Sequence, residues 1–324
     1  MKISALESQN NKTNDKIASS LKRFGFVNSG QLVLSDEENN ELVNLCIEKY
    51  SQLDSDHSHF LSGEEGVTGI RGLPLYDPKI VTLLEKIVSD KNVKYILQSA
   101  LGPDYKIWQI DFRRSMQGDK GLQLHQDGRG QLNLSILLSD NSSGEGTTIF
   151  LPGSHFVPQR IRDLQAELSP GLFKFLGFIF SSLTGKKGDI SFFFNRTWHG
   201  RNPNISGEFN DMILIGFFPA GASMCLQSPY VKWPADFIES IKTTELGRLL
   251  DLSVGTELQN DGFYKIVPQT NSQRIETPFS LLIESNQDNV VNLKLKMIVN
   301  FLRISMTSGR PFKRIFRIFK GKLA

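Results

Sequence analysis

Cysteine is scarce in this sequence of 324 residues. The two cysteines, Cys46 and Cys225, lie far apart along the chain and among apolar residues. Two thiols cannot supply a framework of several disulfides or a four-cysteine structural zinc site. We therefore expect a fold that is stabilised by its apolar core, with both cysteines as buried free thiols.

Long apolar runs are also missing. The longest, GLFKFLGFIF, is too short to span a bilayer and contains Lys174. Residues 1–16 are polar, lack the apolar stretch of a secretory signal and are expected to be disordered. These absences predict a soluble, cytoplasmic protein.

A strong net charge is absent as well. The formal charge is +3, so the chain as a whole is no obvious binder of polyanions. Residues 289–324 nevertheless contain nine Lys and Arg and no Asp or Glu, and after Pro311 the apolar and basic residues alternate at helical spacing. This basic tail is expected either to contact the inner membrane surface peripherally or to pack on the core. Nucleic acid is not expected as a partner, because no base-reading motif accompanies the charge.

The chain is organised as helices followed by strands. Ser35 and Glu38 form a capping box that predicts a helix, and Asp77-Pro78 starts another. From about residue 104 to 226, short β-branched and aromatic runs are separated by turn residues. The prediction is a mostly β domain over 17–226 with flanking helices and a jelly-roll or cupin-like core. A helical insertion is expected at about 158–187, and a mixed extension at 227–324.

The stretch LQLHQDGRG contains the most informative residues. His125 and Asp127 would lie on one side of a strand, because side chains alternate with period two. His199 follows the buried strand ISFFF at the end of GDISFFFNRTWHG. Two imidazoles and one carboxylate form the facial triad that binds ferrous iron and leaves positions open for other ligands. The sequence therefore predicts an iron site formed by His125, Asp127 and His199.

The three other histidines are less promising ligands. His57 and His59 lie in a polar loop that shows no strand pattern, and solvent exposure explains them best. His155 follows a Pro-Gly turn and is expected to be structural, or to line a cavity.

The ordered motifs HQDG, GEGTTIFLPGSH and GDISFFFNRTWHG resemble the phytanoyl-CoA dioxygenase family of Fe(II)/2-oxoglutarate oxygenases. The resemblance extends over roughly residues 20–220. It implies a double-stranded β-helix, iron held by the predicted triad, and 2-oxoglutarate and O2 as co-substrates. Asp127 occupies the position where related halogenases have a small residue, so the resemblance implies hydroxylation or another oxidation.

One feature departs from the family. Its members usually bind the far carboxylate of 2-oxoglutarate with an arginine ten or eleven residues after the second histidine, where this chain has Phe209 and Asn210. A buried carboxylate needs a cation that donates two hydrogen bonds. We expect the co-substrate contacts to come from Arg201, then Arg114, and also from Gln126 and Arg129.

The resulting hypothesis is a dioxygenase that hydroxylates an unactivated C–H bond of a small-molecule, sugar or lipid-linked intermediate. Trp108 and Trp198 are candidates for the cavity wall, and residues 60–73, with four glycines, are expected to form a loop that could act as a lid. Two alternatives remain open: a catalytically silent cupin-like protein that binds a metal or ligand, and an iron oxygenase that does not use 2-oxoglutarate.

Overall fold

The computed structural model describes residues 2–266 apart from gaps. The longest gaps are 157–179 and 220–230, and the shorter ones are 32, 56, 63–65, 128–130, 143, 232, 251–255, 259, 261 and 263. Cys225, most of the predicted helical insertion and the basic tail lie outside the described residues. Among the described helices, none combines the length and apolar character that crossing a membrane requires.

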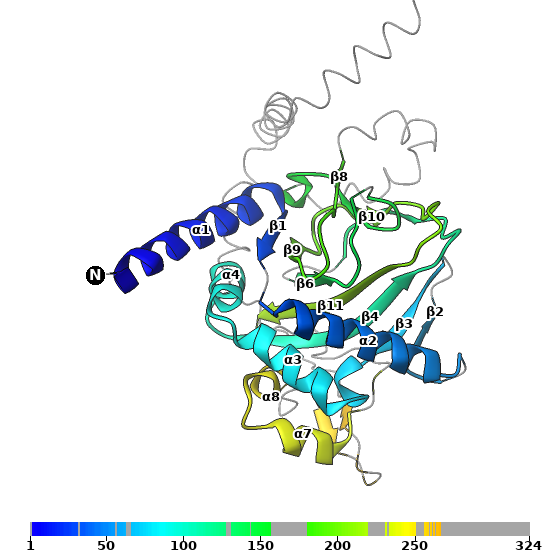
Figure 1. Cartoon of the computed structure of the whole chain (residues 1–324). Helices are drawn as coiled ribbons and strands as arrows, with labels where there is room; N and C mark the ends of the chain where they lie inside the picture. Colours follow the sequence, from blue (N-terminus) through cyan, green and yellow to red (C-terminus); the bar gives the residue numbers. More distant parts are fainter. Residues whose placement is uncertain are drawn as a thin grey trace, which may run out of the picture.

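The core consists of two antiparallel sheets (Figure 1). The larger has seven strands in the order β1-β9-β6-β11-β4-β3-β2, and the smaller has four in the order β5-β10-β7-β8. This arrangement confirms the predicted double-stranded β-helix, a mostly β fold with flanking helices. The strands are β1 Phe26–Gln31, β2 Phe60–Ser62, β3 Val67–Arg71, β4 Tyr105–Ser115, β5 Leu122–His125, β6 Leu132–Leu137, β7 Thr148–Phe150, β8 Ser181–Ser182, β9 Ile190–Phe194, β10 His199–Arg201 and β11 Asn210–Pro219, with a separate pair β12 Thr256–Leu258 and β13 Tyr264–Ile266.

Helices cover one face of the larger sheet (Figure 1). Residues of α3 and α4 form one hydrophobic core with residues of β4, β6 and β11, among them Phe112 and Ile213, which are fully buried. The helices are α1 Lys2–Phe24, α2 Asp36–Gln52, α3 Pro78–Ser89, α4 Lys91–Leu101, α7 Ala235–Ile241 and α8 Glu245–Leu249, with short 3-10 turns η1 Leu73–Leu75 and η2 Ser154–Phe156.

The opposite face of the larger sheet is polar. Register places Gln109, Gly216 and Asn133 in one cross-strand row, and Asp111, Leu214 and Ser135 in the next but one. Residues in direct register share a face, and neighbours along a strand point to opposite faces. Strands β4, β6 and β11 are therefore apolar toward the helices and largely polar toward the interior of the barrel.

The helix starts follow their predicted caps. The Ser35 side chain accepts from the Glu38 backbone N–H, and the Glu38 side chain accepts from the Ser35 N–H, so the capping box is present. Asp77 caps α3, and Pro78 occupies its first turn. These contacts are local, which is why the sequence alone predicts them.

Two segments differ from the expectation. Residues 1–16, predicted to be disordered, belong to α1 from Lys2 onward, and the helix is packed against the core through Ile17 and Leu21. In the segment 60–73, predicted to be a loop, β2 and β3 pair and extend the larger sheet along β4. The partner of β3, which is β4, and the helix α4 that α1 contacts lie far away in the sequence, so local composition gave no indication of these contacts.

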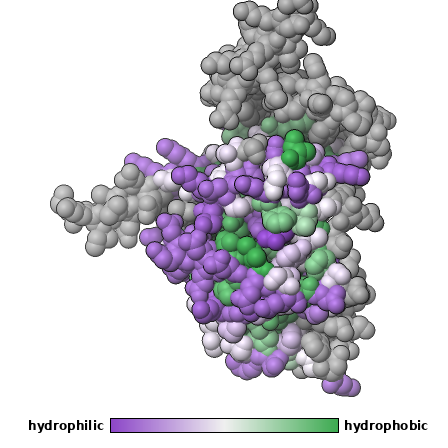
Figure 2. Space-filling model, turned by 45° about the vertical axis from the view of Figure 1, so that its right-hand side comes forward, coloured by the Kyte–Doolittle hydropathy of each residue, from purple (hydrophilic) through white to green (hydrophobic). Residues whose placement is uncertain are grey.

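The side of the described surface that Figure 2 shows is mostly hydrophilic. Figure 2 shows polar residues over much of one side, with apolar patches among them. Ile205 is 79% exposed and Phe209 is 49% exposed, whereas Ile47 and Tyr95 are only slightly above one third exposed. The single described cysteine, Cys46, is fully buried at 0% exposure, and burial raises the pKa of its thiol.

Candidate metal centre

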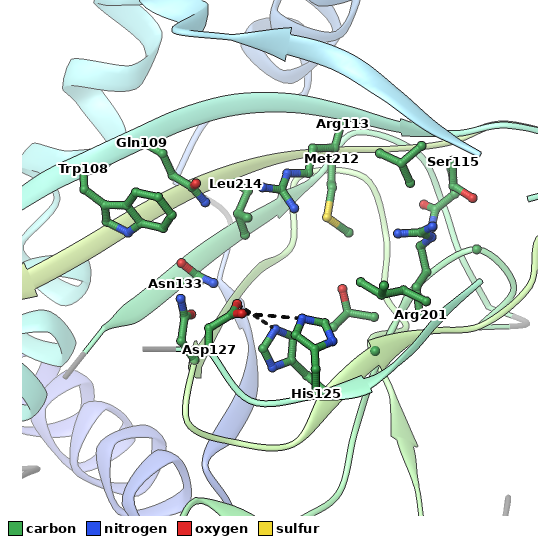
Figure 3. Close-up of a pocket in the computed structure, with 18 residues that line it drawn as sticks. Trp108, Gln109, Arg113, Ser115, His125, Asp127, Asn133, Arg201, Met212 and Leu214 are labelled. Carbon is green, nitrogen blue, oxygen red and sulfur yellow. Dashed lines mark ion pairs between the residues drawn. The ribbon is translucent and has the colours of Figure 1, made fainter. Parts of the chain in front are cut away.

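The three predicted metal ligands converge in the structure. His125 ends β5 and pairs in register with His199, the first residue of β10, and Asp127 follows two residues after His125. One ligand atom from each lies within 4.8 Å of the others. Asp127 is 3.4 Å from His199 Nε2 and 3.7 Å from His125 Nε2, as the dashed lines in Figure 3 indicate.

Both imidazoles are oriented for metal binding by backbone carbonyls. His125 Nδ1 lies 2.9 Å from the Gln123 carbonyl oxygen, and His199 Nδ1 lies 2.8 Å from the Thr197 carbonyl oxygen. A carbonyl only accepts, so each Nδ1 carries a hydrogen and Nε2 is the ring atom that faces Asp127 and can bind a metal. This arrangement fixes the tautomer that a metal ligand needs.

The carboxylate of Asp127 is held in its ionised form. Burial alone would raise its pKa, but His199, His125 and the more distant Arg113 hold the pKa of this carboxyl below its usual range. Its backbone N–H donates to the Asn195 carbonyl at 2.9 Å, which fixes the residue beside β9. The side chain remains 47% exposed toward the pocket. Deprotonated carboxylate and neutral imidazole are the forms that bind a metal.

A pocket of about 130 Å³ opens beside the triad between the two sheets (Figure 3). Its walls combine amide, hydroxyl and guanidinium groups with a few apolar side chains. The lining residues are Val67, Trp108, Gln109, Arg113, Ser115, Leu122, His125, Asp127, Asn133, Gly146, Thr148, Asn195, His199, Gly200, Arg201, Asn210, Met212 and Leu214.

Arg201 reaches this pocket, as its position two residues after His199 predicts. Its guanidinium forms a two-point ion pair with Asp119, with Nε donating at 2.6 Å and Nη2 at 3.0 Å. Asp119 also accepts from the Ser115 hydroxyl at 2.6 Å. Burial would raise the pKa of Asp119, but the bonds from Arg201 and Ser115 lower it. Arg201 is therefore a positioned cation whose charge is largely balanced within the protein.

Arg114 lies on the other face of β4. It donates from Nε at 2.8 Å and from Nη2 at 2.7 Å to the two carboxylate oxygens of Asp211, and its guanidinium lies over the Tyr50 and Phe209 rings. It does not line the described pocket. The structure thus gives Arg114 a structural partner in place of a co-substrate.

Arg113, which was not among the predicted co-substrate contacts, lines the pocket instead. Its contact with Asp111, at 3.4 Å from Nη2, is long, and its buried Nε has no hydrogen-bond partner among the described residues. Burial raises the pKa of Asp111, an effect that Arg113 opposes. Strand parity could have identified Arg113, because it shares a face with Gln109 and Asp111, whereas Arg114 shares one with Phe112.

The remaining predicted contacts lie elsewhere. Gln126 donates to the Arg196 carbonyl at 2.8 Å, and Arg129 lies outside the described residues. His155 is fully buried and bonds through Nε2 to the Lys22 carbonyl at 3.0 Å. Trp198 packs with Leu124 and Ile149, so of the two tryptophans considered for the wall, only Trp108 lines the pocket.

His57 and His59 pack edge to face with each other in the polar segment before β2, and His59 Nδ1 lies 3.1 Å from the Tyr76 hydroxyl. In the part of the chain that the structure describes, only the triad groups three potential metal ligands.

The sequence matches no protein-family model, and no curated protein matches it either. Solved structures do share the fold. EvdMO1 aligns with a TM-score of 0.51 and 20% identity, covering 64% of this chain and 50% of its own, so this chain spans half the length of EvdMO1. SnoK, a non-heme alpha-ketoglutarate-dependent carbocyclase from nogalamycin biosynthesis, aligns at 0.50 and 18% identity over 63% of this chain and 83% of its own.

HygX from Streptomyces hygroscopicus, solved with nickel, 2-oxoglutarate and hygromycin B, aligns at 0.50 and 15% identity over 62% of this chain and 85% of its own. At these identities the likeness establishes the fold, a double-stranded β-helix.

Proposed function

We propose that this protein is an Fe(II)/2-oxoglutarate-dependent oxygenase that oxidises a C–H bond of a small molecule, by hydroxylation. One observation carries the proposal: ligand atoms of two imidazoles and one carboxylate converge within 4.8 Å in a pocket of the barrel. The solved structures that share the fold support it, since SnoK and HygX are described with alpha-ketoglutarate or 2-oxoglutarate.

The residues fit iron by their chemistry. Imidazole and carboxylate ligands without thiolate suit Fe(II), and three protein ligands leave coordination positions open. When bound, ferrous iron, 2-oxoglutarate and O2 supply an oxidative decarboxylation that yields succinate and CO2 and oxidises a substrate C–H bond. The protein's part is to hold the metal with a fixed tautomer at His125 and His199, and to orient both organic molecules.

For the far carboxylate of 2-oxoglutarate, Arg113 is the favoured cation. Its side chain is 36% exposed, against 15% for Arg201, and among the described residues its one ion pair is the long contact to Asp111. Arg201 already donates twice to Asp119. Because a guanidinium with unused donors can bind a carboxylate at two points, Arg113 takes the role that Asn210 cannot fill.

The direct test is an anaerobic titration of the full-length protein with Fe(II) and 2-oxoglutarate. A weak visible charge-transfer band is expected in the wild type and in His57→Ala, an exposed histidine that serves as the control. His199→Ala should lose the band, together with succinate formation under air. A wild type without a band and without succinate would refute the proposal.

Asn210 lies at a position where the phytanoyl-CoA dioxygenase family usually has an arginine. This residue favours a second candidate function, in which the barrel binds iron but not 2-oxoglutarate. Such a protein would be either an iron oxygenase of another kind or a catalytically silent binding protein. Oxygen consumption without succinate would identify the first, and iron uptake without oxygen consumption the second.

The basic tail concerns where the protein acts. We predict that it contacts the inner membrane surface and that the substrate is a sugar or a lipid-linked intermediate. The contact stays a prediction because the tail lies outside the described residues. Vesicle co-sedimentation of the full chain, compared with a chain ending at residue 288, would test it.

A further inference from the structure

We propose that four residues near Asp127 form the binding site of the primary substrate, and that this substrate is a neutral, polyhydroxylated ring such as a sugar. The residues, here named the amide subsite, are Gln109, Asn133, Asn195 and Trp108. The inference rests on the proposed function, because it names the substrate class of the same pocket.

The amide subsite is defined by strand register. Gln109 on β4 and Asn133 on β6 flank Gly216 on β11 in one cross-strand row. Asn195, just after β9, lies on the far side of Asn133, and its carbonyl accepts from the Asp127 N–H. Figure 3 shows Asn133 near Asp127 and Gln109 beside Trp108, with the two amide ends toward the pocket.

Trp108 completes this end of the pocket because of a local irregularity. Register shifts between Gly216 and Phe217, so that Gly216 faces Gln109, Phe217 faces Ile107, and Trp108 is the extra residue. A β-bulge of this kind redirects a side chain. The Trp108 indole lies over Gly216, where an added Cβ would come within 2.1 Å of Nε1. Glycine at this position therefore makes room for the indole between the two amides.

Asn195 Nδ2 donates to Gln131 Oε1 at 2.8 Å, but the amides have further hydrogen-bonding capacity that the protein does not use. Gln109 is 7% exposed, Asn133 3% and Asn195 2%. Within the described residues, neither Gln109 nor Asn133 has a side-chain hydrogen bond, and the buried Oδ1 atoms of Asn133 and Asn195 and Nε1 of Trp108 lack partners. Burying such groups without partners is unfavourable, so their positions along a pocket indicate a ligand that satisfies them.

The subsite and the cations occupy different parts of the pocket. Ser115 and Asn210 pair at the opposite end of the β4–β11 ladder, beside Arg201. Along β4, four residues separate Gln109 from Arg113, a span of about 13 Å, and six separate it from Ser115, a span of about 20 Å. A keto acid held by Arg113 or Arg201 thus leaves the amide end for the second molecule.

The chemistry of the subsite selects neutral hydroxyl groups. A carboxamide both donates and accepts, which matches a hydroxyl that does the same. An indole presents an apolar face to the ring of a sugar. None of the four side chains is ionisable, so a charged substituent placed among them gains no ion pair from the subsite itself.

The test uses saturation-transfer NMR on the full chain with methyl α-D-glucopyranoside and myo-inositol as neutral probes, and glucose 6-phosphate and glucosamine as charged ones. We expect saturation transfer to at least one neutral probe and weaker transfer to both charged ones. In Gln109→Met and Asn133→Leu the neutral signal should fall at least about five-fold, as loss of one net hydrogen bond predicts. Gln52→Met, an exposed residue of α2, is the matched control and should bind as the wild type does.

Thermal melting separates a binding role from a structural one. Removing unpartnered buried amides should leave the melting temperature unchanged or raise it, whereas a loss of more than about 5 °C would show that they support the fold. Such a loss of melting temperature would overturn the inference. So would unchanged probe binding in the variants, a wild type that binds no neutral probe, or a charged probe that binds more strongly than the neutral ones.

Titration of the same proteins with iron and 2-oxoglutarate keeps the two proposals distinguishable. A charge-transfer band without neutral-probe binding would remove the amide subsite and leave the oxygenase proposal standing. Probe binding that depends on Gln109, without a band and without succinate, would support the subsite and remove the oxygenase proposal.

Discussion

The two faces of the larger sheet are built from the same strands but serve different purposes. Toward α3 and α4, residues such as Phe112 and Ile213 are fully buried in an apolar core. Toward the pocket, Gln109 and Asn133 are also buried but polar, and Asn133 Oδ1 lacks a partner among the described residues. Stability is concentrated on the first face, and unsatisfied polar groups are retained on the second, as expected where a ligand binds.

Arg113 and Arg114 are neighbours on β4 that lie on opposite faces of the larger sheet, so substitutions at these two residues compare the two faces directly. Arg114→Gln should leave the buried Asp211 carboxylate without its partner and cost about 3–5 kcal/mol of unfolding free energy. Arg113→Gln should change stability little but raise the KM for 2-oxoglutarate about 100-fold, as loss of a charge-assisted two-point contact predicts. Urea unfolding and succinate assays on both variants measure the two effects.

The opposite pattern would break the comparison. If Arg114→Gln raised the KM while Arg113→Gln mainly destabilised the protein, the assignment of the two faces would have to be exchanged. Arg201→Gln provides a third measurement, and we expect it to alter the KM less than Arg113→Gln does.

The buried His155 should make the free energy of unfolding depend on pH. Burial lowers the pKa of its imidazole from 6.5 to about 3. The folded state therefore keeps His155 neutral while the unfolded chain binds a proton, so stability is full above pH 6.5 and falls by several kcal/mol as the pH approaches 3. His155→Gln should be less stable at pH 7 but lose less stability over this range. Urea unfolding at pH 7, 5 and 4 checks this, and parallel curves would contradict it.

The α2 cap should have a smaller effect. Ser35→Ala removes the side-chain acceptor of the Glu38 N–H and should cost about 1 kcal/mol. Thermal and urea unfolding measure it, and Ser55→Ala, in the polar segment after α2, is the control, for which no change is expected. A cost of Ser35→Ala indistinguishable from this control would show that the cap is replaced by water.

Ser135 should give the smallest effect, on the pocket face. Its buried hydroxyl has no partner among the described residues, so Ser135→Ala removes an unsatisfied group. We expect a change within about 0.5 kcal/mol, or a slight gain in stability. A loss above about 1.5 kcal/mol would mean that the hydroxyl makes a bond that stabilises the fold.

The sequence by itself determined the features that depend on short separations. His125 and Asp127 share a face because strand side chains alternate, and Ser35 caps α2 because its acceptor lies three residues from its donor. The strand-rich composition of residues 104–226 was sufficient to indicate a closed antiparallel barrel. The order of the motifs then indicated that His199 completes the site.

Tertiary structure alone decided which carboxylates the arginines pair with and which polar groups stay unpaired. The partner of Arg114 lies 97 residues away and that of Arg201 lies 82 residues away. The position of Trp108 depends on a bulge against β11. A one-residue change in register exchanges the two faces of a strand, so orientations set by distant strands cannot be derived from local pattern.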